Sequence, residues 1–268
     1  MLYKSGHLLS ILYNKLNTYS FKNGLELRNC SFLLSFSGGV DSALLASLMV
    51  EIRNRYNIRL GFVHFNHNSH KNSIALEDLC LRYSIDNNVK IFCYKLFFSS
   101  DDNFESCARK KRYKILNMLA ERYSYNFILT AHHQDDQLET IYMKTEDGSD
   151  WISQIGIRER MNKLCRPFLD IAKKEIKQCA IQKNIQWIED PTNYDISILR
   201  NYIRHCKLPY AIHLETGLKS KLLKSAQKNK HNFEKTIKKI KKDEKYLIQN
   251  FTQNYLQIDR NIAMSYTI

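Results

Sequence analysis

The sequence Ser35-Phe36-Ser37-Gly38-Gly39-Val40-Asp41-Ser42 decides how this chain folds. It follows a short apolar run at 30–34 that predicts a buried strand, and it leads into an apolar run at 43–50 that predicts a buried helix. Glycines at such a turn let backbone N–H groups approach an anion, and the helix start adds unpaired donors and partial positive charge. The hydroxyls of Ser37 and Ser42 are further donors, so the stretch predicts a phosphate-binding loop.

Asp41 indicates that this loop works with a divalent cation. No lysine follows the glycines, so the loop is not of the longer Walker type. A carboxylate beside phosphates repels them unless a cation such as Mg²⁺ bridges the two, and we therefore expect Asp41 to be a metal ligand. An ordinary corner between a strand and a helix is the alternative interpretation. The full pattern of two glycines, one acid and two serines favours the phosphate site.

The composition sets weaker limits on function. The chain has 268 residues and a formal net charge of +14, which suits a polyanionic partner, although the codon bias of an AT-rich genome would also enrich lysine. Seven cysteines without a C-x-x-C pair indicate reduced thiols rather than a zinc, iron–sulfur or redox site. No apolar run approaches the length of a membrane span, and residues 7–13 favour an amphipathic helix over a signal peptide. We expect a cytoplasmic location, or the stroma of an organelle if the gene is organellar.

Strand and helix patterns alternate after the loop. Further strands are expected at 58–65, 89–96, 127–131 and 163–167, and helices at 73–86, 104–123 and from about 134. This alternation predicts an α/β fold with a doubly wound, mainly parallel sheet and helices on both faces. Asp170 is expected to cap a helix that runs to Lys183.

The chain changes character from about Thr216, where apolar residues recur at helical spacing and lysines fill the other faces. This pattern predicts one or two amphipathic helices. We therefore expect residues 1–210 to form the catalytic domain and residues 211–268 to form a small, basic, helical domain.

Polar side chains follow the expected strands. Ser37, His64, Thr130 and His132 all lie at or just after strand ends. Ligands of parallel sheets bind beyond the carboxyl ends of the strands, so these side chains point to one shared site.

A second signal is the run Thr130-Ala131-His132-His133-Gln134-Asp135-Asp136-Gln137-Leu138-Glu139-Thr140. On a helix that begins near Gln134, Asp136 and Glu139 share one face, and Asp135 and Glu139 are four residues apart. Clustered carboxylates repel one another unless a metal or a cationic substrate neutralises them, so we expect Mg²⁺, an amino substrate, or both. Capping of a helix start would explain Asp135 alone.

These motifs in this order resemble the PP-loop ATP pyrophosphatases, and within them the tRNA(Ile)-lysidine synthetase family. Further matching segments, which place the resemblance at about residues 30 to 205, are His64-Phe65-Asn66-His67, Glu105–Tyr113, Arg166-Pro167-Phe168-Leu169, Asp190–Asn193 and Arg200–Arg204. Two features depart from the family. His70 replaces an arginine, and the loop at 144–150 is acidic where the family has an arginine- and glycine-rich loop. The chain also ends before the long C-terminal region of larger members, so we expect it to depend more on its remaining basic surface.

The resemblance implies that ATP activates C2 of the wobble cytidine in tRNA(Ile) with the anticodon CAU, and that free L-lysine then attacks, with release of AMP and pyrophosphate. It implies ATP binding by Ser37, Gly38, Gly39, Val40, Asp41, Ser42 and His64, with Mg²⁺ held by Asp41 and Asp135. The expected catalytic residues are Asp41, His133, Asp136 and Glu139, and the residues expected to meet the nucleotide and tRNA phosphates are Arg109, Arg112, Arg200 and Arg204.

Two other functions stay open at this point. A PP-loop tRNA thiolase generally needs paired cysteines or a cluster, and this sequence lacks C-x-x-C. The altered loop at 144–150 leaves room for a non-catalytic RNA-binding protein on the same scaffold, although the intact Asp41, Asp135, Asp136 and Glu139 argue against it. No membrane partner is expected, and a homodimer is an open alternative for the assembly.

Overall fold

The computed structural model describes residues 5–66, 72–96, 104–251 and 256–258. The chain forms two compact units. The first comprises Met1–Gln137 and Ile157–Cys206, and the second comprises Leu138–Gly156 and Lys207–Ile268.

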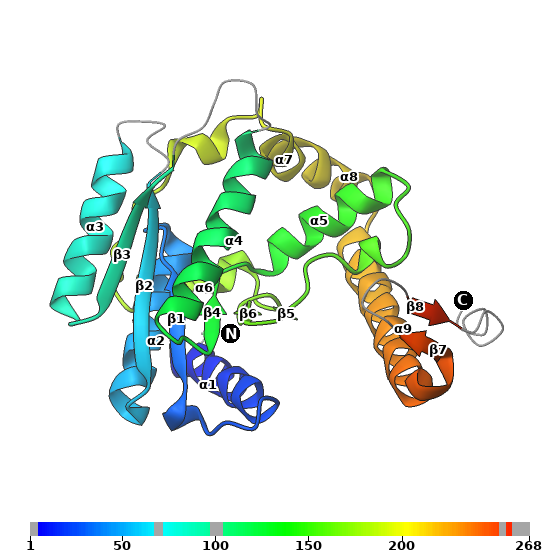
Figure 1. Ribbon diagram of the computed structural model, residues 1–268. Helices are drawn as coiled ribbons and strands as arrows, with labels where there is room; N and C mark the ends of the chain where they lie inside the picture. The colour runs from blue at the N-terminus through cyan, green and yellow to red at the C-terminus, as the bar shows by residue number, and fades with distance from the viewer. Residues whose placement is uncertain (1–4, 67–71, 97–103, 252–255, 259–268) are drawn as a thin grey trace. The chain divides into compact units, whose positions relative to one another are not determined.

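A mainly parallel sheet forms the centre of the first unit. Its strands are β1 Ser31–Ser35, β2 Arg59–Asn66, β3 Lys90–Lys95, β4 Phe127–Leu129, β5 Arg160–Met161 and β6 Leu164–Cys165. They pair in the order β3-β2-β1-β4-β6-β5 (Figure 1). All pairs are parallel except β5 with β6. This confirms the predicted sheet, and the antiparallel edge strand β5 is an addition that the sequence pattern did not reveal.

Helices pack on both faces of this sheet, which confirms the doubly wound architecture (Figure 1). The helices of the first unit include α1 Ser5–Phe21, α2 Val40–Tyr56, α3 Asn72–Asp86, α4 Phe104–Arg122 and α6 Lys173–Gln182. Alternate side chains of β1 enter two separate cores, because successive residues of a strand point to opposite faces. Phe32 and Leu34 pack with α1, α2 and α6, whereas Leu33 packs with α4.

The chain reverses direction across the sheet at β1. Strands β2 and β3 extend the sheet to one side of β1, while β4 pairs with its other side. The loops that leave β1 and β4 therefore diverge, and the space beyond their carboxyl ends is where ligands of such sheets bind. The phosphate-loop motif follows β1, and the two histidines follow β4.

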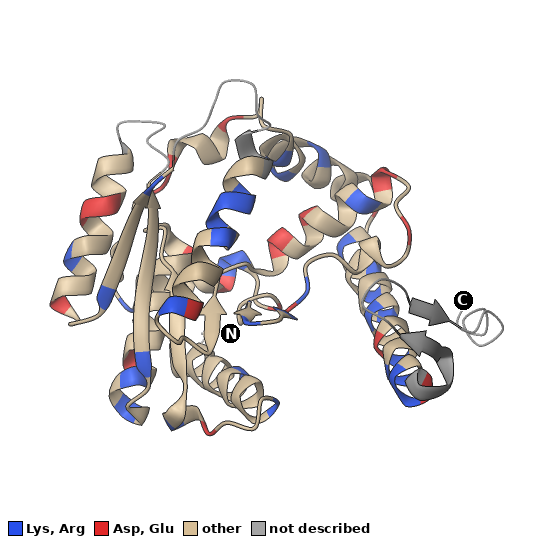
Figure 2. Ribbon diagram, viewed as in Figure 1, with Lys and Arg blue, Asp and Glu red and all other residues tan. Residues whose placement is uncertain are grey.

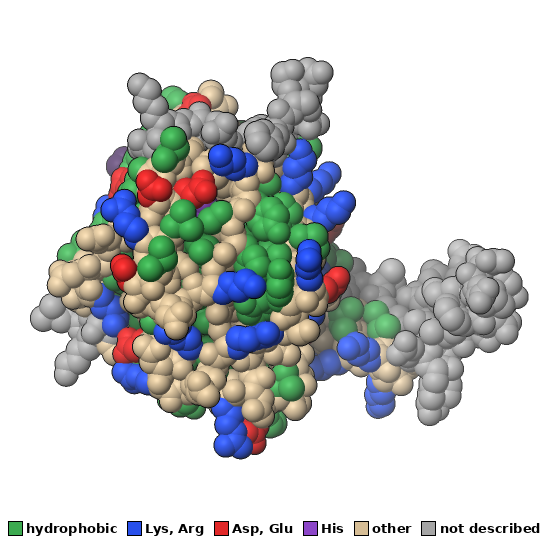
Figure 3. Space-filling view, turned by 60° about the vertical axis from the view of Figure 1, so that its left-hand side comes forward, with side chains coloured by type: hydrophobic (Ala, Val, Ile, Leu, Met, Phe, Trp, Pro, Cys, Tyr) green, Lys and Arg blue, Asp and Glu red, His purple; other side chains and the backbone are tan. Residues whose placement is uncertain are grey.

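The outer strand β3 is protected by cations. Lys90 Nζ lies 4.9 Å from the centre of the Phe92 ring and 4.5 Å from that of Tyr123. Figure 3, turned so that this side of the molecule comes forward, shows Lys and Arg side chains around the exposed apolar ones. Charged residues at a sheet edge discourage pairing with another chain.

The predicted cap of α6 is wrong. Helix α6 begins at Lys173 with Ala172 at its N-cap position, and Asp170 instead accepts a hydrogen bond from Lys15 Nζ at 2.7 Å. The start is delayed because the Ile171 carbonyl accepts a hydrogen bond from Gln134 N at 2.9 Å, which ties this segment to the start of the next helix.

The segment that carries the last motif is irregular. A 3₁₀ turn at Pro191–Tyr194 is capped by Asp190 and is followed by α7, Leu199–Tyr202. A π-helical turn at Ile203–Lys207 comes next, and such turns are frequent at functional sites.

The second unit is mostly helical. Helix α5, Gln134–Glu146, begins in the first unit and ends in the second, which also contains α8 Leu208–Leu214, α9 Leu218–Leu247 and a hairpin of β7 Ile248–Phe251 and β8 Leu256–Ile258. Helix α9 buries Leu218, Leu222 and Ala226, and Figure 2 shows Lys and Arg along its length. This confirms the helical character expected after Thr216, whereas the hairpin was not expected. Within the described residues, no helix combines the length and the apolar character that a membrane span needs.

Candidate active site

The loop between β1 and α2 has the geometry of an anion cradle. Gly38 has a φ of +86°, and a Cβ atom there would lie 2.9 Å from Leu76 Cδ2 and 3.3 Å from Cys80 Sγ. The backbone angle therefore requires glycine, and a Cβ atom there would also force the tip of the Leu76 side chain to shift. Gly39 is the N-cap of α2, and the hydroxyls of Ser37 and Ser42 lie 2.9 Å apart. The helix start and the two hydroxyls thus face the same turn.

His64 lies behind this loop and supports it. Its side chain is 2% exposed, and its Nδ1 lies 3.0 Å from the Phe36 carbonyl oxygen. Phe36 N also donates to the Val63 carbonyl at 2.8 Å, so β2 holds the loop through both backbone and side chain. Burial lowers the pKa of His64, which favours the neutral ring with its proton on Nδ1. His67 and His70 lie outside the described residues.

Asp41 is held by a lysine that the sequence interpretation missed. Lys173 Nζ lies 2.5 Å from Asp41 Oδ2, and the other carboxylate oxygen, Oδ1, is buried without a hydrogen-bond partner. An unpartnered buried oxygen carries a desolvation cost that a metal ion would relieve. Nothing in the local sequence distinguishes Lys173 from its neighbour Lys174.

These residues fit a Mg²⁺ ion that comes with a nucleotide. Mg²⁺ at such sites usually keeps several waters and takes one or two carboxylates together with substrate phosphates. Among the described residues, no three His, Cys, Asp or Glu side chains gather as a complete set of metal ligands. A Mg²⁺ ion that also binds substrate phosphates needs only one or two protein carboxylates, and Asp41 in the phosphate loop supplies one. Asp135 Oδ2 accepts a hydrogen bond from Lys173 N at 3.3 Å, so this second candidate ligand also contacts the start of α6.

His133 and Asp136 form the N-terminal cap of α5. His133 N donates to Asp136 Oδ2 at 2.9 Å, and Asp136 N lies 3.4 Å from His133 Nδ1, which is the reciprocal pattern of a capping box. The other ring nitrogen, His133 Nε2, lies 3.4 Å from Asp136 Oδ2 and 3.8 Å from Asp41 Oδ2. One imidazole therefore lies between the carboxylate of the phosphate loop and that of α5.

Two arginines complete this group. Arg200 and Arg204 both donate to Asp136 Oδ1, at 3.2 and 3.1 Å. Burial opposes the charge on Asp136, but His133 and Arg200 outweigh it and hold the pKa of Asp136 below its ordinary value. The carboxylate thus stays ionised although it is only 8% exposed. Residues from the last motif and from α5, far apart in sequence, meet here, a contact that the sequence did not predict.

His132 is a neutral base within a positively charged environment. Burial lowers the pKa of His132 to about 3, and nearby arginine charges add to this shift while the Asp136 charge opposes it. His132 Nδ1 lies 2.9 Å from Thr130 Oγ1. The ring is therefore uncharged at neutral pH.

Arg166 is the most buried of these arginines, at 3% exposure. It donates to the Arg158 carbonyl at 2.6 Å and to Tyr113 Oη at 3.4 Å, while its Nε is buried without a partner. Arg109 lies over the Tyr113 ring, 5.5 Å from its centre, and Arg112 follows on the same helix. The side chain of Glu105, from the same motif, is outside the described residues.

Glu139 lies one helical turn after Asp136 along α5, in the part of the helix that belongs to the second unit. Its side chain is 1% exposed.

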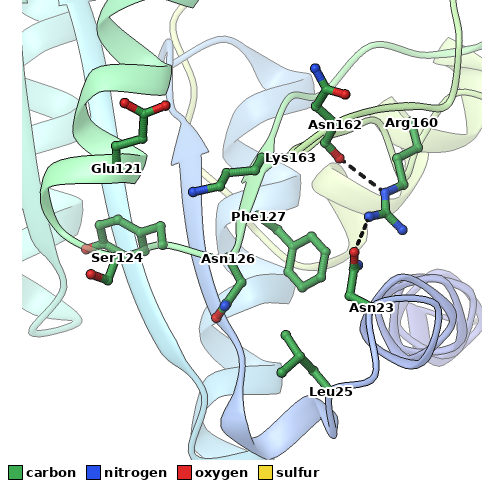
Figure 4. Close-up of a pocket in the computed structure, with 10 residues that line it drawn as sticks. Asn23, Leu25, Glu121, Ser124, Asn126, Phe127, Arg160, Asn162 and Lys163 are labelled. Carbon is green, nitrogen blue, oxygen red and sulfur yellow. Dashed lines mark hydrogen bonds between the residues drawn. The ribbon is translucent and has the colours of Figure 1, made fainter. Parts of the chain in front are cut away.

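A separate groove of about 670 Å³ lies at the other end of the sheet (Figure 4). Asn126 and Lys163, which line it, precede β4 and β6 and so mark the amino ends of these strands. Arg160 crosses the groove wall and donates to Asn23 Oδ1 at 2.6 Å. The groove therefore lies away from the phosphate loop.

Comparison with solved structures supports the fold. A U34-tRNA thiolase of Methanococcus maripaludis, NcsA with its [4Fe-4S] cluster, superposes with a TM-score of 0.67 at 17% identity over 84% of this chain and 80% of that one. An NMN synthetase of Francisella tularensis gives a TM-score of 0.51 at 11% identity over 85% of this chain and 95% of that one. At these identities the similarity concerns the fold alone.

Curated relatives are more similar in sequence. A tRNA(Ile)-lysidine synthase of Buchnera aphidicola subsp. Schizaphis graminum is 32% identical over 243 residues, which cover 82% of this chain and 52% of the relative. One of Treponema denticola is 32% identical over 226 residues, which cover 79% of this chain and 48% of the relative. The chain spans about half the length of the curated relatives it matches.

The family comparison agrees with the loop geometry. The family model described as PP-loop domain matches residues 12–211, which include the glycine turn, both histidines after β4 and the Asp190–Arg204 segment. This chain belongs to the PP-loop family of ATP-binding domains.

Proposed function

We propose that this protein uses ATP to join free L-lysine to C2 of the wobble cytidine of tRNA(Ile) with the anticodon CAU, forming lysidine and releasing AMP and pyrophosphate. The observation that carries the proposal is the group formed by Asp41, His133, Asp136, Arg200 and Arg204, which connects the phosphate loop with the motifs shared with lysidine synthetases. The named curated relatives support the same reaction.

The loop from Ser37 to Ser42 is suited to the phosphates of ATP. Its N–H groups and hydroxyls would bind the departing pyrophosphate, and Mg²⁺ held by Asp41, with Asp135 nearby, would neutralise its charge. His64 would contribute by fixing the loop, since its contact is with the Phe36 carbonyl.

Activation by ATP answers a chemical need. A carbonyl such as C2 of cytidine is a poor electrophile toward an amine, and adenylation converts its oxygen into a good leaving group. The attacking amine must be uncharged, so a nearby base has to accept its proton. We assign the acceptance of this proton to His133 together with the ionised Asp136.

The acidic residues of α5 suit a cationic substrate. We assign Asp136 to positioning the cytidine and the lysine amine, and Glu139 to the second ammonium group of lysine. Glu139 is buried one helical turn after Asp136, so the two carboxylates share one face of α5.

The tRNA would be held by cationic side chains. We assign Arg109, Arg112, Arg200 and Arg204 to phosphates of the nucleotide and of the tRNA, and the lysines of α9 to the tRNA backbone. We also propose that residues 1–210 form the catalytic domain and that residues 211–268 form a basic helical domain, with a homodimer as an alternative to the monomer.

A thiolase is not favoured by the thiol chemistry. Cys30, Cys80, Cys165 and Cys179 are buried, and burial raises the pKa of all four thiols. These four thiols are therefore poor nucleophiles, and the three that are not buried, Cys93, Cys107 and Cys206, form no C-x-x-C pair in the sequence.

The decisive experiment incubates the full chain with ATP, Mg²⁺ and lysine on unmodified tRNA(Ile) and analyses the nucleosides by mass spectrometry. Lysidine should appear only when all components are present, and norleucine, which lacks the ε-ammonium group, should not replace lysine. Pyrophosphate release without any modified nucleoside would indicate a different amine or tRNA. Binding of tRNA without pyrophosphate release would instead identify a non-catalytic RNA-binding protein.

A further inference from the structure

The phosphate loop of this protein has no lysine of its own, although a loop with one carboxylate needs a cation to hold several phosphate charges. Walker loops carry that lysine directly after the glycines. Here Lys173, which is 132 residues after Asp41, places its Nζ 2.5 Å from Asp41 Oδ2. A cation is thus supplied to the loop from the start of α6.

The backbone of Lys173 is fixed from both sides. Lys173 N donates to Asp135 Oδ2 at 3.3 Å, and Gln134 N donates to the Ile171 carbonyl at 2.9 Å, so the start of α6 is tied to the start of α5. At its other end, Lys183 Nζ lies 3.1 Å from Glu51 Oε2 of α2. The position of the Lys173 Cα atom is therefore set by two helices that border the loop.

The side chain of Lys173 is much less constrained. It is 37% exposed, and its contact is with the more accessible side of Asp41, while Asp41 Oδ1 remains buried and unpartnered. An ammonium on a four-carbon stem can change partners at small cost when both partners are anionic and near solvent. The ion pair fits a reversible contact better than a permanent one.

We propose that Lys173 is the phosphate-binding lysine of this loop and that it exchanges partners: it neutralises Asp41 when no nucleotide is bound, and it turns to the β- and γ-phosphates when a divalent cation takes the Asp41 carboxylate. This inference rests on the proposed ATP-binding function. It assigns to α6 the charge that other phosphate loops carry within their own sequence.

Exchange makes two opposite predictions for Lys173→Met. Binding of inorganic pyrophosphate with Mg²⁺ should weaken about tenfold or more, because a tenfold change corresponds to the loss of one contact of about 1.4 kcal/mol. Binding of Mn²⁺ alone should become several-fold tighter, since the competing ammonium is gone. A lysine that only supports the fold would move neither value in these directions.

Calorimetry with magnesium pyrophosphate and electron paramagnetic resonance with Mn²⁺ measure the two affinities on the full chain. Lys174→Met is the matched control, because Lys174 is the exposed neighbour, and both affinities should stay at the wild-type values. Lys173→Arg keeps the charge and should retain pyrophosphate binding within about threefold. Unchanged pyrophosphate affinity in Lys173→Met overturns the phosphate role, and unchanged Mn²⁺ affinity overturns the exchange.

A second variant keeps the proposal testable if Lys173→Met does not fold. Asp41→Asn leaves Lys173 in place without its anionic partner, so this variant should bind metal-free pyrophosphate more tightly than the wild type does. Adding Lys173→Met to this variant should remove the gain in pyrophosphate affinity. A gain that persists in the double variant overturns the proposal. Failure of the wild-type protein to bind either magnesium pyrophosphate or ATP would instead reject the ATP-binding function itself.

Discussion

Asp41→Asn separates the chemical role of this residue from its structural role. The variant keeps the shape of the side chain and an acceptor oxygen for Lys173, but it removes the negative charge beside the phosphate loop. We expect ATP-dependent pyrophosphate release to be lost while the fold remains intact.

The structure gives small and opposing effects on stability. The Lys173 pair is 23% and 37% exposed, and pairs of this kind contribute about 0.2–1 kcal/mol. A negative charge in the first turn of α2 adds about 0.3–1 kcal/mol. Against these, Asp41 Oδ1 is buried without a partner, and a neutral amide at that position has a lower desolvation cost, an effect of about 1 kcal/mol. The net change in unfolding free energy should stay within about 1 kcal/mol.

Thermal unfolding and pyrophosphate release are the two measurements. A change of 1 kcal/mol moves the melting temperature of a protein of this size by about 2–4 °C, so a larger fall would show that Asp41 mainly supports the fold. Loss of a group that stabilises developing charge typically lowers the rate about a hundredfold or more. Release at the wild-type rate would refute the metal assignment.

Further predictions concern the loop, the neutral histidine and the basic helix. Gly38→Ala should lower the unfolding free energy by about 1–2 kcal/mol or more through its positive φ and the clash with Leu76, whereas Gly39→Ala, whose Cβ would lie 3.7 Å from its nearest neighbour, should be tolerated; equal melting temperatures would contradict this. His132 has a depressed pKa in the folded state, so the unfolded chain takes up the proton first as the pH falls. Stability should therefore decrease below about pH 6.5, by about 1 kcal/mol per pH unit, and His132→Gln should show a correspondingly smaller slope in denaturant titrations from pH 7 to 5. Replacing exposed lysines of α9 with glutamine should weaken tRNA binding and flatten its salt dependence by roughly 0.7–0.9 in log–log slope per lost phosphate contact, and an unchanged slope would show that α9 is merely solvated. The lysines suited to this test are Lys224, Lys228, Lys235 and Lys238.

Local features of the site were predictable because adjacent residues determine them. The glycine turn, the strand before it and the helix after it follow from a short stretch in which Gly38 must adopt a positive φ. The parallel sheet followed from the alternation of strands and helices. Edge strand β5, only two residues long, has no periodicity that a pattern can reveal.

Contacts between segments far apart in the sequence were harder to predict. Lys173 pairs with Asp41 across 132 positions, and no local pattern separates it from the many other lysines. The prediction that Asp170 caps α6 was wrong because a tertiary contact fixes where the helix begins. Gln134 N donates a hydrogen bond to the Ile171 carbonyl. Arg200 and Arg204 were predicted to bind phosphates, and their hydrogen bonds to Asp136 could not be predicted from the sequence.

The capping box at the start of α5 makes the same two residues contribute to both stability and the proposed reaction. His133 and Asp136 satisfy each other's backbone N–H groups and also carry the proposed reaction, and the loss of such a cap costs about 1 kcal/mol. Even in a protein that no longer needed the reaction, substitution of His133 or Asp136 would destabilise the first turn of α5. Drift at these positions is therefore opposed by selection for a folded protein as well as by selection for activity.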